Sequence, residues 1–417
     1  MGFLSALTGN ARDRQAIALD IGTEFVKALI FEVQGGVAQV TGVGRQRQRL
    51  ADMQGGTVTD IHGVIGNCEA ALEQAAEQAG YLPEQVIIGI AGELVKGTTT
   101  TIKYVRPEPT TKITHEELQE ILQKVQRRAH DRARALLAWE TGHAEIDVRL
   151  VNAAIVDVRI DGYKVTNPLG FQGREVQVGI YSAFAPIVHL GALQTIAEEL
   201  QLDLLSVTAE PYAVARVMGP DESSEFSAIF IDIGGGTTDI AVVNNGGLIG
   251  TKMFAIGGRT FTKRLMTVES STFTEAEERK LAYAAGTLGK KEETAVHDAL
   301  QADVNVWLSG VELTLGEFTN VELLPSRILL CGGGSNLPDI ERVLGEPAWS
   351  KRLPFARKPA IHFLKPAEIP TVKDATKSLG TIQDVTPMAL ANLAIDLVGR
   401  STLKQSAMSR VVGALKA

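Results

Sequence analysis

Apolar runs and amphipathic stretches alternate over the first hundred residues of the chain. The stretch QAIALDIGTEFVKALIFEV (15–33) has apolar residues on both sides of Gly22, which predicts two strands joined by a tight turn. Apolar residues at helical spacing over 59–82 predict a helix, and the short apolar run EQVIIGIAG (84–92) predicts a buried strand. This order of strands and helix is typical of an α/β fold.

The hydrophobic pattern changes at about residue 106. A stretch rich in proline and threonine leads into a long, charged amphipathic helix, and Thr114 is expected to cap it, with Glu117 closing a capping box. Residues 144–185 then alternate apolar and polar positions and are broken by turn residues at 161–162 and 167–170. One helix with antiparallel strands predicts a small α+β insertion.

The α/β pattern returns after the insertion. A helix, a short strand and a second helix are expected over 186–219, and residues 259–325 are mostly helical and charged. The stretch SRILLCGGGSNLPDIERVLG (326–345) predicts a strand, a glycine turn and a helix, and 386–400 predicts an apolar helix.

Two stretches of the chain share one plan. IALDIGTEFVKALIFEV and IFIDIGGGTTDIAVV both run from apolar residues through Asp-Ile-Gly and a polar turn into a second β-rich run. Two related halves would place two aspartate–glycine hairpins on facing domains. The expected divisions are 14–105 with 186–226, 106–185 as the insertion, 227–260 with 326–385, 261–325 as a helical subdomain, 386–400 as a returning helix, and 401–417 as a terminal segment.

Composition narrows the class of protein. The length of 417 residues allows two to four domains. Hydrophobic residues make up 45% of the chain and charged residues 22%, which is an ordinary globular balance. The net charge of −8 disfavours a protein that wraps nucleic acid, so no nucleic-acid partner is expected. Cys68 and Cys331 form no disulfide framework or metal-binding pattern, which suits a reducing cytoplasm. No apolar run reaches the roughly 18 residues of a membrane-spanning helix.

The first glycine turn, at residues 20–23, suits a phosphate site as well as an ordinary hairpin. An aspartate such as Asp20 at a strand end can hold a water on Mg²⁺, while Gly22 lets backbone N–H groups approach phosphate and Thr23 adds a hydroxyl donor. Lys27, seven residues after Asp20, is long enough to reach a phosphate. Because Asp-x-Gly is also common turn chemistry, this loop alone leaves both interpretations open.

The second glycine turn carries a stronger signal. Three consecutive glycines cost backbone entropy, and a plain hairpin needs fewer of them. The expected turn is concave and rich in backbone N–H groups, with a plain hairpin as the alternative. It comprises Asp232, Gly234, Gly235, Gly236, Thr237, Thr238 and Asp239.

The third glycine turn lies between a predicted buried strand and a helix. Gly332, Gly333 and Gly334 at a helix N-terminus favour a flat or anionic group, and a tight packing turn is the alternative. Neither the Gly-x-Gly-x-x-Gly dinucleotide fingerprint nor a Gly-Lys-Ser/Thr phosphate loop occurs in the chain.

In this order and separation, the three loops resemble the actin-like ATPase superfamily, which includes actin, heat-shock chaperones and sugar kinases. The resemblance implies a duplicated, ribonuclease-H-like α/β fold of two domains with ATP in the cleft between them. It assigns Asp20, Gly22, Thr23 and Lys27 to the first phosphate motif, Asp232 through Thr238 to the second, and Gly332, Gly333, Gly334 and Ser335 to the adenosine motif. Asp20 and Asp232 would orient Mg²⁺ through waters.

The resemblance also suggests three further site residues. TAEPYAVARV (208–217) is similar to the segment that carries a catalytic acidic residue, so Glu210 is the candidate for positioning the attacking water. The alternative is a plain carboxylate at a helix start. AEERK (276–280) resembles a segment whose Glu and Lys touch the nucleoside in bacterial members, which implies Glu277 and Lys280, with a charged helix face as the alternative.

The insertion resembles that of the bacterial cell-division protein family FtsA and its relative PilM of type IV pili. The Asp-Gly, Asn-Pro-x-Gly and Gly-x-Glu-Val elements at 161–176 recur there in similar order. FtsA also implies a C-terminal amphipathic membrane helix. Here Leu403, Ala407, Met408, Val411, Val412 and Leu415 share one helical face, and Lys404, Arg410 and Lys416 suit anionic headgroups. Phe3, Leu4 and Leu7 form a rival anchor, and a packed or frayed end is the alternative.

The resemblance implies an ATP-binding, actin-like cell-division protein with slow or absent hydrolysis. It would lie peripherally on the inner face of the cytoplasmic membrane, self-associate into filaments, and bind the C-terminal tail peptide of FtsZ. The alternative is a PilM-like scaffold that binds a membrane-protein tail peptide in pilus assembly. A small-molecule phosphotransferase of the sugar-kinase branch is disfavoured because no second-substrate site is evident.

Overall fold

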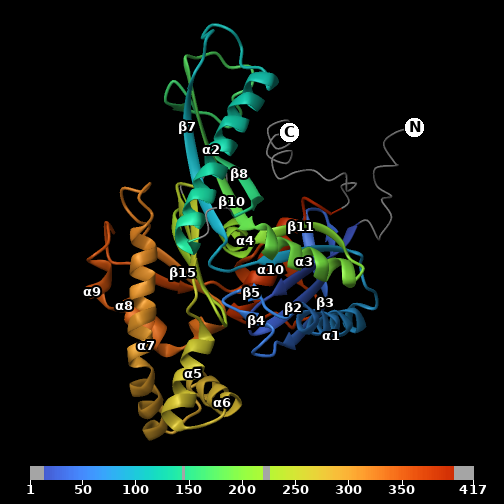
Figure 1. The fold of residues 1–417 in the computed structure, drawn as a ribbon, viewed down its shortest axis with the longest axis vertical. Helices are drawn as coiled ribbons and strands as arrows, with labels where there is room; N and C mark the ends of the chain where they lie inside the picture. Colours follow the sequence, from blue (N-terminus) through green and yellow to red (C-terminus); the bar gives the residue numbers. More distant parts are fainter. Residues whose placement is uncertain (1–13, 143–145, 219–225, 399–417) are drawn as a thin grey trace.

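Two mixed β-sheets, each covered by helices, form the body of the computed structural model, which describes residues 14–142, 146–218 and 226–398 (Figure 1). The six-stranded sheet has the order β11 (Asp203–Ala209), β6 (Gln85–Ile90), β1 (Gln15–Ile21), β2 (Phe25–Gln34), β3 (Val37–Arg47) and β17 (Val372–Asp374). The nine-stranded sheet has the order β16 (Ala360–Phe363), β15 (Arg327–Cys331), β12 (Ala228–Ile233), β13 (Thr238–Asn244), β14 (Gly247–Phe254), β7 (Lys96–Val105), β10 (Glu175–Pro186), β8 (Val148–Ile160) and β9 (Tyr163–Lys164).

The two sheets repeat one strand arrangement, in agreement with the predicted duplication. β1 pairs antiparallel with β2 and parallel with β6, and β12 pairs in the same way with β13 and β15. In the first hairpin Asp20 lies opposite Lys27, and in the second Asp232 lies opposite Asp239. The duplication therefore places an aspartate at the same point of both hairpins, but it faces a cation in one half and a second acid in the other.

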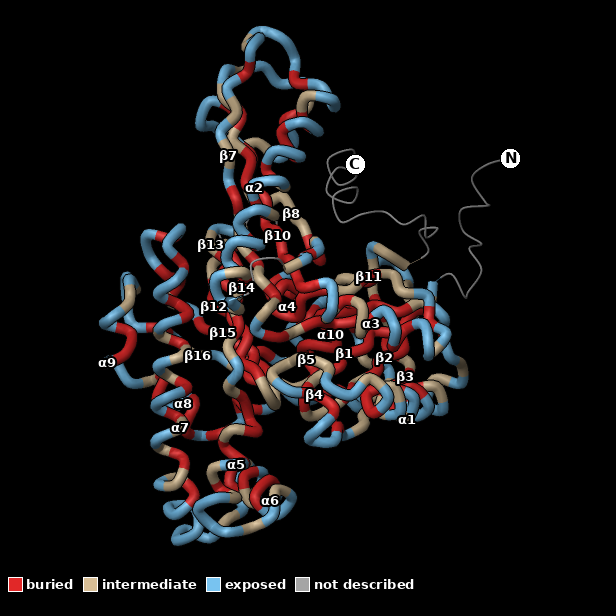
Figure 2. The backbone as a smooth tube through the Cα atoms, viewed as in Figure 1, coloured by how far each residue is buried: buried red, intermediate tan, exposed pale blue. Residues whose placement is uncertain are grey.

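Helices cover both sheets, and the strands between them are mostly buried (Figure 2). One hydrophobic core lies on the first sheet and extends to strands of the second, a further core lies between the second sheet and α5 to α8, and two smaller ones lie in the insertion. The first half carries α1 (Ile61–Ala79), α3 (Ile187–Glu199), α4 (Glu210–Val217) and α10 (Val385–Ala394), with the small hairpin β4 (Met53–Gln54) and β5 (Thr57–Val58). The second half carries α5 (Gly258–Glu269), α6 (Phe273–Ala284), α7 (Lys290–Gly316), α8 (Pro338–Gly345) and α9 (Pro347–Ser350). Short 3₁₀ turns occur at 333–336, 366–368 and 382–384.

Helix α1 shows how local sequence signals place an element. Asp60 caps its N-terminus by accepting from the Gly63 N–H, and Gly80 ends it in a left-handed conformation at φ 81°. A Cβ at Gly42 of β3 would lie 2.1 Å from the Ala75 carbonyl oxygen of α1. Glycine at this position therefore allows the helix to pack closely on the sheet.

The insertion projects from the body as a sheet of β7, β10, β8 and β9 covered by α2 (His115–Thr141) (Figure 1). Thr114 caps α2 by accepting from the Glu117 N–H, but the Glu117 carboxylate does not complete the predicted capping box. It forms a bidentate ion pair with Arg106 instead, with distances of 2.8 and 2.9 Å. The nearby guanidinium is a stronger partner for the carboxylate than a backbone N–H.

The insertion is continuous with the sheet of the second half. β7 pairs with β14 at two positions, Thr98 with Gly250 and Gly97 with Thr251. The expected domain divisions remain a prediction. Within the described ranges no helix is both long and apolar enough to cross a membrane. The predicted terminal helix at 401–417 and the rival anchor around Phe3 lie outside the described residues.

Candidate functional site

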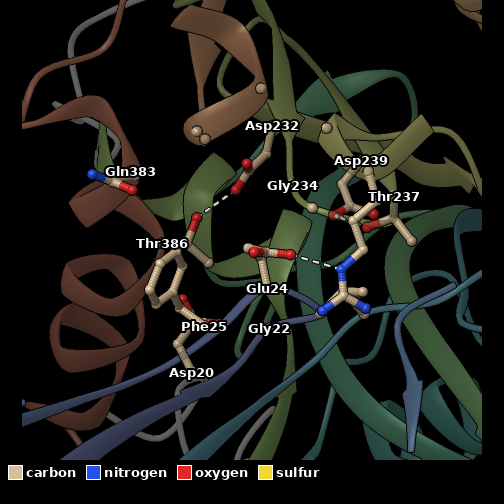
Figure 3. A pocket seen from close by; sticks show the side chains of 18 of the residues that line it. Asp20, Gly22, Glu24, Phe25, Asp232, Gly234, Thr237, Asp239, Gln383 and Thr386 are labelled. Carbon is tan, nitrogen blue, oxygen red and sulfur yellow. Dashed lines mark hydrogen bonds and ion pairs between the residues drawn. The ribbon is translucent and has the colours of Figure 1, made fainter. Parts of the chain in front are cut away.

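A cavity between the two hairpins brings most of the predicted site residues together (Figure 3). Its walls come from both sheets, from α5 and α6, and from the loop after β15. The predicted residues that line it are Asp20, Gly22, Thr23, Lys27, Glu210, Asp232, Gly234, Gly235, Thr237, Glu277, Lys280, Gly332, Gly333 and Gly334. Segments more than 300 residues apart in the chain therefore meet at one place.

Three predicted residues do not line this cavity. The Thr238 hydroxyl donates to the Ile256 carbonyl at 2.7 Å and accepts from the Trp307 indole N–H at 2.9 Å. The Ser335 hydroxyl donates to the Cys331 carbonyl at 2.5 Å. Both hydroxyl groups are therefore hydrogen-bonded within the protein, and their side chains point away from the cavity into packed surroundings.

The third, Gly236, faces the first hairpin. A Cβ at this position would lie 2.7 Å from Thr23 Oγ1, and a Cβ at Gly235 would lie 2.7 Å from Glu24 Cβ. The triple glycine thus allows the tips of the two hairpins to approach one another. This packing role was not part of the sequence prediction, which assigned all three glycines to phosphate contact.

Glycine is required at position 332 for two reasons. Its φ of +80° lies in the left-handed region, and a Cβ there would lie 2.0 Å from Asp232 Oδ1. Any residue with a Cβ at position 332 would therefore prevent the third loop from approaching Asp232 of the second hairpin this closely.

Lys27 is the buried cation of the first hairpin. Its Nζ lies 3.1 Å from Asp20 Oδ2 and donates to the Gln383 carbonyl at 2.9 Å. Burial lowers the pKa of Lys27, but Asp20, Asp232 and Asp384 outweigh burial and raise it above its usual value. Lys27 is therefore protonated at neutral pH and supplies a positive charge to the cavity.

Buried carboxyl groups dominate the rest of the cavity. Burial raises the pKa of Asp232, Asp239 and Glu210, and the negative charges of the neighbouring acids raise those of Asp239 and Glu210 further. Asp232 accepts a hydrogen bond from Thr386, and the two side chains point toward each other in Figure 3. The site therefore contains more negative charge than Lys27 balances and can accommodate a cation.

Several polar atoms of the cavity have no protein partner. Glu210 Oε1, Asp239 Oδ1 and Arg259 Nη2 are buried without a hydrogen bond to any residue in the described part of the chain. Buried polar groups are normally paired, so unsatisfied atoms at a cavity wall indicate a missing ligand or water. Carboxylate oxygens beside a glycine-lined wall fit a group that combines a cation with phosphate.

Glu277 and Lys280 lie where α5 and α6 meet the cavity. Lys280 Nζ donates to Glu277 at 2.8 Å, to Thr262 Oγ1 at 2.8 Å and to the Gly258 carbonyl at 3.1 Å. Each charge is satisfied by the other, so both remain buried without a ligand.

Other cavity residues were not predicted from the sequence: Glu24, Phe25, Arg259, Gln383 and Thr386. Arg259 forms an ion pair with Glu24 at 2.7 Å, which joins the second half to the first. Gly257-Gly258 before Arg259 resembles the other glycine turns and was an available signal. No local sequence pattern marks Gln383 and Thr386 as site residues. They reach the cavity only because the end of the chain packs back onto the first half in the folded protein.

Direct metal binding is not evident from the side chains. Among the described residues no group of three His, Cys, Asp or Glu side chains is placed to hold a metal ion. A metal role of Asp20 and Asp232 therefore depends on waters or on a ligand's own oxygens.

The duplicated hairpins and the cavity between them define the class as the actin-like ATPase fold. The subunit of a solved PilM-PilN type IV pilus biogenesis complex superposes with a TM-score of 0.64 and 16% identity, covering 91% of this chain and 98% of that one. The ethanolamine utilization protein EutJ from Carboxydothermus hydrogenoformans superposes with a TM-score of 0.50 and 15% identity, covering 91% and 89%.

Sequence comparison shows which proteins of known family the chain is similar to. The family model described as Cell division protein FtsA matches residues 229–366. Cell division protein FtsA of Enterococcus faecalis is 24% identical over 352 residues, covering 79% of this chain and 76% of that protein. FtsA of Streptococcus pneumoniae is 26% identical over 360 residues, covering 81% and 74%. The chain is thus similar in sequence to cell division protein FtsA over most of its length, and it has the actin-like fold.

Proposed function

We propose that the chain binds ATP with Mg²⁺ in the cavity between its two hairpins. The observation that carries this proposal is the combination of a glycine-lined wall, one buried cation and unsatisfied carboxylate oxygens in one cavity. The N–H groups of Gly22 and Gly234 donate to the Phe25 and Thr237 carbonyls, so the N–H groups that follow them, at Thr23 and Gly235, would meet phosphate, with Lys27 supplying positive charge. Gly332 to Gly334 would accept the adenosine, beside Glu277 and Lys280.

Mg²⁺ would neutralise phosphate charge, and Asp20 and Asp232 would orient it through waters. Glu210 would orient a water, and the burial of its Oε1 at the cavity wall without a protein partner supports this role. Its raised pKa favours the neutral form until a cation enters the site. Hydrolysis would therefore depend on nucleotide and metal being bound together, and we expect it to be slow or absent.

Calorimetric titration with ATP tests this proposal. We expect binding that requires Mg²⁺ and is weakened about tenfold or more by Asp232→Asn, since charge-assisted contacts are the stronger hydrogen bonds. The control is Asp298→Asn on the exposed surface of α7, which is expected to leave binding unchanged. ATP binding that is equal in both variants and independent of Mg²⁺ would overturn the proposal.

We further propose that the protein acts in cell division, the process for which its FtsA relatives are named. In this proposal it forms filaments at the cytoplasmic face of the membrane through an amphipathic segment at 401–417 and binds the FtsZ tail peptide. The divisions 14–105 with 186–226 and 227–260 with 326–385 would be the two domains that close on the nucleotide, with 261–325 as the nucleotide-capping subdomain.

Two assays separate the steps of this second proposal. Pelleting with anionic liposomes compares the full chain with a chain ending at Arg400, and loss of pelleting on truncation supports the terminal anchor. Equal pelleting of both would favour the N-terminal segment, and no pelleting would remove the membrane proposal. Binding of an FtsZ tail peptide rather than a pilus-protein tail peptide separates the division role from a PilM-like scaffold.

A further inference from the structure

A second cavity lies at the junction between the insertion and the second half. It has a volume of about 460 Å³ and shares no lining residue with the cavity between the hairpins. Its walls come from β7, β8, β9 and α2 of the insertion and from the turn between β13 and β14. It lies where β7 separates from β14 after only two paired positions.

The charges of this cavity differ in sign from those of the whole chain. The chain carries a net charge of −8, but the cavity is lined by four cationic side chains, Arg128, Arg132, Arg159 and Lys164. Asp157 is the only carboxylate among the lining residues that the structure describes, and it forms an ion pair with Arg159 at 2.8 Å. Arg128, Arg132 and Lys164 form no ion pair with any residue of the described ranges.

The positions of these cations make them unfavourable to one another. Arg128 and Arg132 are four residues apart on α2, so they share one helix face, where like charges are destabilising. Arg159 and Lys164 are directly opposite in the β8–β9 hairpin, where like charges are also destabilising. Two such pairs from different elements line one cavity, and an anion between them would relieve both.

The cavity also contains an unsatisfied buried donor. Thr100 of β7 is 5% exposed and lines the cavity, and its Oγ1 has no hydrogen-bond partner in the described part of the chain. The neighbouring Thr99 differs, because its hydroxyl donates to the Leu248 carbonyl at 2.5 Å. The amides of Asn244 and Asn320 add further polar groups to the wall.

We propose that this cavity is a second ligand site, which binds a small anion that carries phosphate groups. Guanidinium groups bind phosphate oxygens in bidentate geometry, and a cavity of this size accommodates a pyrophosphate or a larger phosphate ester. Because its walls come from the insertion and from the second half, a bound anion would also hold these two parts of the molecule together.

The test is a calorimetric titration of the full chain at low ionic strength with two probes. One is inorganic pyrophosphate, and the other is dihexanoyl phosphatidic acid at a concentration at which it stays monomeric. The test variant is Arg128→Gln with Arg132→Gln. The control is Arg127→Gln with Arg134→Gln, two exposed arginines of the same helix that do not line the cavity and whose loss changes the net charge equally.

We expect the test variant to bind the probe at least about tenfold more weakly, and the control to bind as the parent does. Pyrophosphate bound between the hairpins is unaffected by either change, since neither arginine pair lines that cavity. Pyrophosphate binding that the test variant weakens and the control does not supports a free phosphate compound as the ligand, and the same result with the lipid alone supports a headgroup. Binding of neither probe, or equal affinity of the test and control variants for each probe, overturns the proposal.

Thr100→Val provides a second measurement that does not depend on arginine. The hydroxyl is unpaired in the absence of ligand, so we expect the variant to fold with unchanged or raised thermal stability. We expect its affinity for the effective probe to fall by about threefold or more, as the loss of one hydrogen bond implies. An unchanged affinity would exclude Thr100 from the site and contradict the proposed position of the anion.

Discussion

At the scale of single residues, Glu210 is the most consequential group of the cleft. It is 7% exposed, and burial followed by the charges of Asp20, Asp239 and Asp232 raises its pKa well above the usual value. The folded state therefore binds the Glu210 proton more tightly than the unfolded state does. The resulting stabilisation is fully present below the unfolded pKa and is lost as the pH rises through the folded pKa.

This loss of stability with rising pH predicts that Glu210→Gln stabilises the protein at alkaline pH when nucleotide and Mg²⁺ are absent. The amide removes a buried, unpaired charge, so we expect the free energy of unfolding to rise by about 1–3 kcal/mol at pH 8. The gain should decrease as the pH is lowered toward pH 4. Urea unfolding at several pH values measures it, with exposed Glu278→Gln as control. A loss of stability at pH 8 would contradict the assignment of an uncompensated carboxylate.

At the scale of elements, two glycines of α1 should respond oppositely to the same substitution. A Cβ at Gly66 meets open space, whereas a Cβ at Gly63 would lie 2.4 Å from Asp52 Oδ1. We expect Gly66→Ala to raise the free energy of unfolding by about 0.5–1 kcal/mol, because alanine loses less backbone entropy in a helix. Gly63→Ala should lower it by about 1–3 kcal/mol through overpacking. Urea unfolding of both variants is the measurement, and changes of the same sign would count against the packing of α1.

The start of α2 depends on one buried ion pair. Arg106 is 3% exposed, and besides Glu117 it donates to the carbonyls of Thr111 and Gly173 at 3.0 and 3.1 Å. It therefore ties the loop before α2 to the loop before β10.

Removing the carboxylate should loosen this part of the insertion specifically. We expect Glu117→Ala to destabilise the insertion by about 3 kcal/mol, because it leaves the buried guanidinium unpaired. Hydrogen exchange should increase at 106–118 and 170–174 and remain unchanged in α1. Exposed Glu120→Ala is the matched control on the same helix. Unchanged exchange in the Glu117 variant would show that the ion pair contributes nothing to the order of these loops.

At the scale of the whole molecule, a buried ion pair joins the two halves across the cleft. Glu24 of the first hairpin binds Arg259 of α5 at 2.7 Å, and Arg259 also donates to the Met53 carbonyl at 3.3 Å. Both side chains of the ion pair are largely buried, which makes the contact stronger than an exposed pair.

We predict that this ion pair keeps the cleft closed. Glu24→Gln and Arg259→Gln should each increase the radius of gyration in small-angle scattering, and a double-mutant cycle should give a coupling of about 1–3 kcal/mol. Arg47→Gln is the control, because Arg47 binds the same carboxylate at 2.8 Å from within the first half. If the control opens the molecule as much as Arg259→Gln does, the pair between the halves is not what closes the cleft.

Patterns between residues that are near in sequence were sufficient to predict much of this protein. The strand–turn–strand units, the cap at Thr114 and the helix and strands of the insertion follow from hydrophobic period and turn residues, and the resemblance of the three glycine loops to a known superfamily implied the actin-like fold. These features depend on backbone sterics and on interactions within a few residues, which the order of side chains determines directly.

Only the tertiary structure decided how the halves meet. It turned Thr238 and Ser335 into the interior, used Gly236 for contact between the hairpins, and brought Gln383 and Thr386 to the cavity from the end of the chain. It also joined β7 to β14 and thereby formed the second, basic cavity. The contacts of Gly236 with Thr23, of Thr386 with Asp232 and of β7 with β14 join residues more than a hundred positions apart, and no local pattern records which distant surface a side chain will meet.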